Sequence, residues 1–413
     1  MMNKVFFKTF GCRTNIYDTE LIAANLENFQ RVFSEDEAEI IVVNSCTVTN
    51  SADATVRAYI KKMNSLNKRV IIAGCGALSK GESLKKSGLV FGVLGHSKKG
   101  NLNELLSLNK PFVQKGDLTK LDEQKSIKSD KTKAFIKIQE GCNFKCSYCI
   151  IPTVRGKARS YDEKLLLNQA RELIDSGYKE IVLTGTNIGS YGKDKNSSLG
   201  GLLKILGEID GLKRVRLGSI EPVQIDKEML EVLSQNYIEK HLHIALQHTS
   251  PKMLKIMRRR NEVEKDLKLF EKLSSMGFAL GTDYIVGHPG ESDEVWNEAL
   301  EWFKKFPLTH LHGFTFSKRE GTISANMDLD VSQKVAKKRL KELKDIVFTN
   351  NLNFRKKHKE IKLEVLVEKY ENGFSSGYDQ FYNLVKIEGE YEKNRWLELP
   401  SYAIKDGYNE ANF

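Results

Sequence analysis

Three cysteines in the middle of the chain are the residues best suited to chemistry. They stand in the run Cys142-Asn-Phe-Lys-Cys146-Ser-Tyr-Cys149, directly after a strand-like segment over residues 134–139. Three thiolates on one short loop can hold a soft metal ion or an iron–sulfur cluster. Because a cubane of four irons takes four ligands, three cysteines leave one iron open. The spacing therefore predicts a cluster at which a further ligand can bind and react.

A structural zinc site is the main alternative for this loop. Zinc in such sites takes four cysteine or histidine ligands. The histidines closest in sequence, His96 and His241, are far from the loop along the chain. We therefore favour an iron–sulfur cluster.

The other three cysteines each follow a predicted strand near the start of the chain. Cys12, Cys46 and Cys75 come after strands predicted over residues 4–10, 39–44 and 69–73. Ligands bind open α/β sheets beyond the carboxyl ends of the strands, so the three thiols should meet at one edge. A free cysteine is often a small buried apolar residue, which is the alternative for each. Three at equivalent strand ends favour a second three-cysteine cluster site.

Length and composition limit the class of protein. A chain of 413 residues is long enough for two or three domains with separate cores. No apolar run reaches the roughly 18 residues of a membrane span, and the first residues lack a signal-peptide pattern. We expect a cytoplasmic protein without a membrane partner, in which six cysteines are ligands or reactive thiols rather than disulfides. The net charge of +11 suggests a polyanionic partner.

The first part of the chain, residues 1–110, alternates short apolar strands with helices. Helices are predicted over residues 19–28 and 52–64, and a fourth strand over 89–94. This alternation indicates βαβ units and an open parallel α/β sheet. Residues 111–133 are polar and lysine-rich without periodicity, which predicts a linker.

A second βα series fills residues 134–359. Its strands are predicted over 134–139, 180–184, 214–218, 242–246, 281–286 and 310–316, and its helices over 163–176, 199–209, 224–235, 251–275 and 292–305. Right-handed crossovers repeated in this way curl into a barrel, which eight rounds would close. Six rounds predict an open (β/α)6 part-barrel, with a lateral mouth for a large substrate.

Polar or glycine-rich residues follow every strand of this series, where barrel active sites lie. Examples are Thr184-Gly-Thr-Asn187 after the second strand and Ser219-Ile-Glu221 after the third. Helix caps favour the same residue types and are the alternative for any single strand end.

Two further segments complete the chain. A helix predicted over residues 331–359 carries ten lysines and arginines against two acidic residues. A solvated face is the usual meaning of such a charge run, and a phosphate-contacting surface is the alternative. Residues 360–413 alternate strand residues with turn glycines, which predicts a small β-barrel. Its aromatic residues either stack on bases or fill a small core: Phe374, Tyr378, Phe381, Tyr382, Tyr391, Trp396 and Tyr402.

The cysteine motif, with Tyr148 before its last cysteine, resembles that of the radical S-adenosylmethionine (SAM) enzymes. Other segments resemble the methylthiotransferases among them: Gly11-Cys12-Arg-Thr-Asn15, Asn44-Ser-Cys46-Thr-Val-Thr49, Gly74-Cys75, Arg155-Gly156-x-x-Arg159-Ser160, Gly287-x-Pro289-Gly290-Glu291 and Ser317-x-Arg319-x-Gly321-Thr322. The tail is similar to the TRAM RNA-binding domain of that family. His288 and Phe316 depart from the family, which often has Phe and Tyr at these positions.

The resemblance implies two [4Fe–4S] clusters, on Cys142, Cys146 and Cys149 and on Cys12, Cys46 and Cys75. It implies S-adenosyl-L-methionine as cofactor, with Tyr148, Thr186, Asn187 and Glu221 as its contacts, and assigns no separate catalytic side chain. The first cluster would cleave SAM to a 5′-deoxyadenosyl radical, and the second would supply a methylthio group. A low-potential donor such as flavodoxin or ferredoxin would provide electrons.

The segment from Cys46 to Asp53 resembles the branch that acts on C2 of N6-threonylcarbamoyladenosine in tRNA, at position 37 beside the anticodon. The isopentenyladenosine branch usually has an Arg-Glu pair after this cysteine, which is absent here. Isopentenyladenosine in tRNA and an aspartate of a ribosomal protein are the alternative substrates. A non-catalytic two-cluster protein for electron transfer or RNA binding is the alternative of another class.

Overall fold

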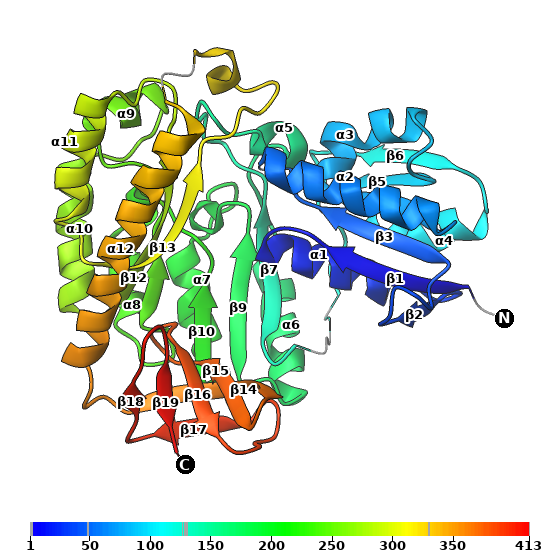
Figure 1. The fold of residues 1–413 in the computed structure, drawn as a ribbon. Coiled ribbons are helices and arrows are strands. Elements are labelled where there is room, and N and C mark those ends of the chain that lie inside the picture. The colour runs from blue at the N-terminus through cyan, green and yellow to red at the C-terminus, as the bar shows by residue number, and fades with distance from the viewer. Residues whose placement is uncertain (1–2, 48, 126, 128–130, 329–330, 413) are drawn as a thin grey trace.

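The computed structural model describes residues 3–47, 49–125, 127, 131–328 and 331–412. Figure 1 shows a parallel sheet with its helices beside a central half-barrel, and a small sheet beneath the half-barrel. Residues 126 and 128–130 of the predicted linker lie outside the described part. Of the helices described, none is long and apolar enough to cross a membrane.

The N-terminal sheet has six parallel strands in the order β2-β1-β3-β4-β5-β6. They are β1 (Lys4–Thr9), β2 (Gln30–Val32), β3 (Ile40–Ser45), β4 (Arg69–Gly74), β5 (Gly92–His96) and β6 (Phe112–Gly116). Apolar side chains of α2 (Asn50–Ser65) and α3 (Cys75–Lys86) pack on one face. Those of α1 (Arg13–Ala24) and α4 (Leu102–Ser107) pack on the other. The predicted open parallel α/β sheet is confirmed.

Two elements of this domain differ from the prediction. The helix predicted over residues 19–28 is α1, which already begins at Arg13, because its first turns bury Thr14, Asn15 and Asp18 against the barrel. These polar residues hide the start of the helix from an apolar pattern. Strand β6 lies within the segment predicted as a linker, where it pairs with β5 at the sheet edge. Its mostly exposed residues lack the apolar signature of a buried strand.

The central half-barrel has six strands, as predicted: β7 (Ala134–Glu140), β9 (Glu180–Gly185), β10 (Arg214–Leu217), β11 (His241–His243), β12 (Ala279–Val286) and β13 (Leu308–Thr315). Short bridges from Val215 to Ile238 and from Ile220 to Ile244 join the β7-β9-β10 sheet to the β11-β12-β13 sheet. A short β8 (Arg159–Ser160) runs antiparallel to β7. Among the described residues no pairing joins β7 to β13, so the barrel is open there.

Helices cover the outside of the half-barrel: α6 (Glu163–Asp175), α7 (Leu199–Leu206), α8 (Lys227–Leu233), α9 (Pro251–Ile256), α10 (Val263–Ser275) and α11 (Asp293–Phe303). The single helix predicted over residues 251–275 is wrong, because α9 and α10 are separate. Between them Arg258 has a φ of +52°, a left-handed conformation that ends a helix. The connecting residues place Arg259 near the cysteine loop.

The basic helix α12 (Gln333–Lys357) packs along β13 and leads to the tail. Two of its cations are structural, since Arg339 pairs with Glu291 and Arg355 donates to the Tyr408 carbonyl. The exposed lysines of its outer face remain in solvent.

The tail forms a curled sheet in the order β17-β14-β15-β16-β19-β18, consistent with the predicted small barrel. Its strands are β14 (Leu363–Glu371), β15 (Phe374–Tyr378), β16 (Leu384–Glu388), β17 (Trp396–Leu399), β18 (Ala403–Ile404) and β19 (Asn409–Ala411). Phe381 and Tyr402 lie in its core with Val365 and Val385. Part of the aromatic set therefore fills the core, which is one of the two roles expected for it.

The small sheet lies at the amino ends of the barrel strands (Figure 1), and a buried carboxylate helps to fix it there. Glu180 pairs with Arg216 at 2.6 Å and with Arg214 at 2.7 Å. Arg214 then donates to the Glu364 carbonyl at 3.0 Å, and Arg216 to the Asp379 carbonyl at 2.9 Å. One barrel carboxylate thus orients two arginines that hold the tail.

Glu180→Gln should weaken the fold in a pH-dependent way. Burial alone would raise the pKa of Glu180, but Arg216 and Arg214 lower it to about 2. A carboxyl with a lowered pKa adds stability above its unfolded pKa of roughly 4.3, and this is lost as pH falls toward 2. The shift corresponds to roughly 3 kcal/mol. Thermal unfolding midpoints of wild type and variant should differ most near neutral pH, and the difference should shrink below about pH 4 and vanish only near about pH 2. The exposed Glu360→Gln is the control, and a constant difference across pH would contradict the assignment.

Candidate active site

The three cysteines of the central loop come together between β7 and α5 (Ile151–Arg155). The chain turns at Gly141, whose φ is +77° and where a Cβ would lie 2.1 Å from the Lys157 carbonyl oxygen. Only glycine fits this turn. The Cys142 amide donates to the Gly156 carbonyl at 3.0 Å, and all three thiols line one cavity of about 210 Å³.

The four predicted cofactor contacts, Tyr148, Thr186, Asn187 and Glu221, line the same cavity. Asn187 follows β9, and its Nδ2 donates to the Cys142 Sγ at 3.4 Å. Its Oδ1 is buried and, within the described part of the chain, has no hydrogen-bond donor. A buried carbonyl oxygen without a donor is costly, so this atom is suited to accept a hydrogen bond from a ligand.

Arg259 belongs to this site although the sequence patterns did not indicate it. Its guanidinium pairs with Glu221, with Nη1 to Oε1 at 3.0 Å, and lies 3.6 Å from the Cys146 Sγ. Burial opposes its charge, but neighbouring negative groups including Glu221 raise its pKa overall. The only local signal is the run of three arginines at 258–260. A fixed cation here stabilises negative charge on the cysteine sulfurs.

The N-terminal cysteines lie at the carboxyl ends of the neighbouring strands β1, β3 and β4, as predicted. Cys12 caps α1, Cys46 follows β3, and Cys75 opens α3. Gly11 packs so closely that a Cβ on it would lie 2.5 Å from the Cys46 Cβ. Burial raises the pKa of the Cys75 thiol, and the charge of Cys12 adds to this effect. The fold therefore brings the three thiols to one edge of the sheet.

One buried guanidinium, that of Arg155, joins the two halves of the site. Its Nε donates to the Cys75 Sγ at 3.1 Å. One of its terminal nitrogens donates to the Asn15 Oδ1 at 2.6 Å and lies 3.2 Å from the Asp18 Oδ2, and the other pairs with Glu140. Arg155 therefore ties the N-terminal domain to the strand that leads into the cysteine loop.

Further buried charges surround Arg155. Lys137 pairs with Asp18 at 2.7 Å and with Glu140 at 2.8 Å, and all three side chains are buried. Burial opposes ionisation of Asp18, but Lys137 and Arg155 lower its pKa overall. Burial and nearby cations lower the pKa of His96 to about 3, so this imidazole is neutral. The carboxylates remain charged and hold both cations in place.

A second cavity, of about 250 Å³, adjoins the first and shares Tyr148, Cys149, Ile151, Gln247 and Asp283 with it. Thr49 of the N-terminal domain and Ser317 of the barrel also line it. Its remaining walls are largely apolar and include Ile150, Ile285, Phe314 and Phe316. Such a cavity is suited to a flat ring held next to the cysteine loop.

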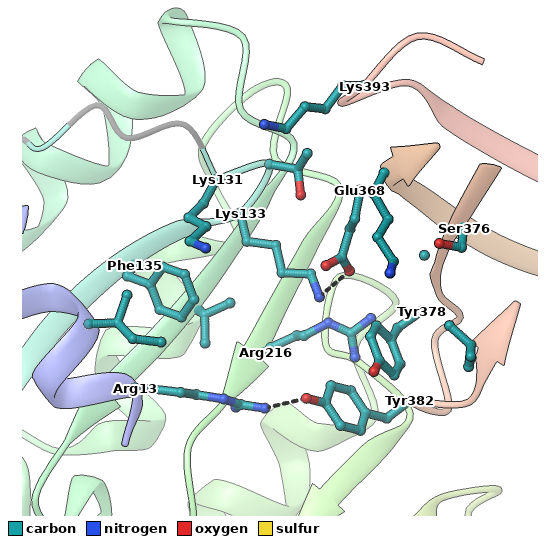
Figure 2. A pocket seen from close by; sticks show the side chains of 16 residues that line it. Arg13, Lys131, Lys133, Phe135, Arg216, Glu368, Ser376, Tyr378, Tyr382 and Lys393 are labelled. Atoms are coloured by element: carbon teal, nitrogen blue, oxygen red, sulfur yellow. Dashed lines mark hydrogen bonds and ion pairs between the residues drawn. The ribbon is translucent and has the colours of Figure 1, made fainter. Parts of the chain in front are cut away.

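A larger basic cavity, of about 520 Å³, lies where the three parts of the molecule meet (Figure 2). Its basic lining residues are Arg13, Lys131, Lys133, Arg216, Lys369 and Lys393. The rings of Tyr378 and Tyr382 stack at 4.7 Å, and Arg13 donates to the Tyr382 hydroxyl at 2.9 Å. Lys133 pairs with Glu368 at 2.6 Å. The excess of cations suits this cavity to anionic groups.

Family models match both halves of the site. Residues 136–303 match the radical SAM superfamily, and residues 4–95 match the uncharacterized protein family UPF0004. A Helicobacter pylori protein provisionally named a methylthiotransferase is 47% identical over the full length of both chains. The threonylcarbamoyladenosine tRNA methylthiotransferase MtaB of Thermotoga maritima is 35% identical, with 98% of this chain and 95% of the relative covered.

Two more comparisons bear on specificity and fold. The tRNA-2-methylthio-N6-dimethylallyladenosine synthase of Bacillus subtilis is 32% identical, covering 94% of this chain and 81% of the relative. The radical SAM methyltransferase TsrM of Kitasatospora setae, solved with cobalamin and a [4Fe–4S] cluster, aligns with a TM-score of 0.61. That alignment covers 79% of this chain and 77% of TsrM at 14% identity, which supports the fold alone.

Gly141→Ala should lower the iron bound by the cysteine loop. The added Cβ meets a backbone carbonyl at 2.1 Å, and the left-handed φ is unfavourable for alanine, so the turn must shift. Iron per chain after anaerobic reconstitution is the measurement. Gly100→Ala, which has open space around its Cβ, is the matched control. Equal iron in the two variants would contradict this role of the turn.

Proposed function

Because this chain belongs to the radical SAM methylthiotransferases, we propose that it adds a methylthio group to C2 of N6-threonylcarbamoyladenosine in tRNA, beside the anticodon. Membership makes the chain an enzyme that uses SAM and a [4Fe–4S] cluster. The name of the Thermotoga maritima relative supports the nucleoside. The observation that carries the proposal is the pair of three-cysteine groups, which Arg155 links through its contacts with Cys75 and Glu140, beside an apolar cavity lined by Cys149 and Thr49.

In this proposal Cys142, Cys146 and Cys149 hold the cluster that binds SAM. When bound, the cluster and the cofactor would supply the reductive cleavage of a sulfonium and so the radical chemistry needed at adenosine C2. Asn187 Oδ1, which lacks a donor among the described residues, would accept a hydrogen bond from the SAM amino group. The Glu221 carboxylate, held by Arg259, would accept hydrogen bonds from ribose hydroxyls.

Cys12, Cys46 and Cys75 would hold a second [4Fe–4S] cluster that supplies the sulfur. Three thiols gathered at one edge of the sheet suit a soft iron–sulfur group. Arg155 donates to Cys75, which favours the thiolate that such a group requires. The apolar cavity would hold the adenine ring between the two clusters, with Phe314 and Phe316 among its walls.

The positively charged surfaces of the protein suggest how it would contact tRNA. The basic cavity of Figure 2 and the exposed lysines of α12 would contact tRNA phosphates, and Tyr378 and Tyr382 offer aromatic rings beside them. Electrons would come from a small low-potential protein of the flavodoxin or ferredoxin kind.

Isopentenyladenosine is the second candidate nucleoside. The apolar walls of the cavity favour it, because an isopentenyl group is apolar whereas a threonylcarbamoyl group carries a carboxylate. The Bacillus subtilis synthase is named for the matching dimethylallyl substrate. The segment after Cys46 favours threonylcarbamoyladenosine, and a direct measurement decides between them.

Mass spectrometry of tRNA nucleosides tests the substrate. The gene is deleted from its host, and the digest is compared with wild type and with the complemented strain. We expect loss of 2-methylthio-N6-threonylcarbamoyladenosine alone. Loss of the isopentenyl product instead would move the assignment to that nucleoside. Unchanged 2-methylthio nucleosides would exclude tRNA and favour a protein substrate such as a ribosomal aspartate.

Two cysteine variants test the separate roles of the two cysteine groups in SAM cleavage and in methylthio transfer. Cys75→Ala should hold about four irons in place of about eight, should still convert SAM to 5′-deoxyadenosine, and should form no methylthio product. Cys146→Ala should also lose about four irons but should make neither product. Iron analysis and chromatography of both products are the measurements. A Cys75→Ala protein with full transfer activity would overturn the role of the N-terminal group. Wild type that forms no 5′-deoxyadenosine would favour a non-catalytic protein.

A further inference from the structure

Three side chains lie at one level of the barrel lumen, on the neighbouring strands β11, β12 and β13. Asp283 pairs in register with His312, and His243 pairs with Gly281, two residues before Asp283 on the same face. Gly281 leaves the space that the imidazole needs, because a Cβ there would lie 2.8 Å from the His243 Nδ1. Strand register and a small residue thus direct His243, Asp283 and His312 toward one point.

The distances between these side chains match a set of metal ligands. The Asp283 Oδ1 lies 3.1 Å from the His243 Nε2 and 3.6 Å from the His312 Nδ1. One ligand atom from each residue lies within 4.8 Å of the other two. Ligand atoms of a tetrahedral zinc with bonds of about 2.1 Å are roughly 3.4 Å apart. One cation can therefore be reached by all three.

The His243 Nε2 is a second, independent sign of a missing ligand. This atom is buried, and within the described part of the chain it makes no well-directed hydrogen bond in spite of its nearness to Asp283. A buried imidazole nitrogen whose contact with a carboxylate is poorly directed is only partly satisfied. A metal ion bound at its lone pair would satisfy it.

Charge favours a cation at this point. The described ion-pair partners of Asp283 are the two histidines, so one carboxylate faces two imidazoles. Asp18, His96 and Glu140 also lie close together, but they are a poor cation site. Lys99, Lys137 and Arg155 already neutralise their negative charge. The Ser219 hydroxyl donates to the Asp283 Oδ2 at 3.3 Å and leaves Oδ1 for a ligand.

We propose that His243, Asp283 and His312 bind a divalent transition-metal cation such as Zn²⁺, with a coordination position open toward the lumen. Two imidazoles and a carboxylate are a ligand set for Zn²⁺ and Fe²⁺. Asp283 lines both the cofactor cavity and the apolar cavity, so the cation lies beside both. This site does not depend on which nucleoside is the substrate.

Metal analysis of the holoenzyme tests the site. The clusters are assembled first, so that the cysteines are occupied, and the protein is dialysed to equilibrium against Zn²⁺ at increasing concentration. Zinc and iron per chain are then measured together. Wild type should bind about one zinc without loss of iron. His312→Ala and Asp283→Asn should each weaken this binding by more than about tenfold with iron unchanged.

His358→Ala is the matched control, because this histidine follows α12 and lies outside the cluster. It should bind zinc as wild type does. His312 is largely exposed, so its truncation should leave the thermal midpoint unchanged, and the isosteric Asp283→Asn provides an independent arm. Absence of zinc from iron-loaded wild type would overturn the proposal. So would wild-type zinc affinity in both variants, or an equal loss in the control.

Discussion

The buried charge of Arg155 is the constraint on which the rest of the structure depends. A guanidinium withdrawn from water costs several kcal/mol unless hydrogen-bonded anions surround it. The partners of Arg155 come from two domains, because Glu140 belongs to the barrel while Asn15 and Asp18 belong to the N-terminal helix. Only one arrangement of the domains satisfies all of them. In that arrangement Cys75 lies against Arg155, at the end of the helix that follows the loop with the other three cysteines.

A second arginine completes the alignment from the barrel side. Arg319 donates to the Asn50 Oδ1 at 2.8 Å and pairs with Asp53 at 2.7 Å, and the Asn50 amide donates to the Ser317 Oγ. Arg155 and Arg319 thus hold the N-terminal domain at two points, and the apolar cavity with Thr49 lies close to the second. Fixing a domain at two points limits rotation between the groups of thiols. Chemistry that passes an atom between two centres requires such a fixed separation.

The sequence predicted what local patterns encode and missed what distant contacts decide. All six cysteines were predicted to follow strand ends. Because the strands of a parallel sheet run in the same direction, their carboxyl ends meet at one edge. Asp18 and Lys137 form an ion pair across 119 positions of sequence, and no local pattern links them. The same contacts bury Thr14 and Asn15, which is why α1 began earlier than its apolar pattern indicated. Arg259 was missed for a related reason, since its partner Glu221 follows a different strand.

Buried positive and negative side chains are equal in number, so the net positive charge of the chain lies on its surface. Among the described residues, eight lysines and arginines are buried, and so are eight aspartates and glutamates. The interior is therefore close to neutral, as the cost of unpaired buried charge requires. The excess of +11 must be carried by exposed and half-buried side chains. Much of it lies on the outer face of α12 and around the basic cavity, both of which solvent reaches. The ion pairs that align the two groups of thiols thus use none of the positive surface that a polyanion would meet.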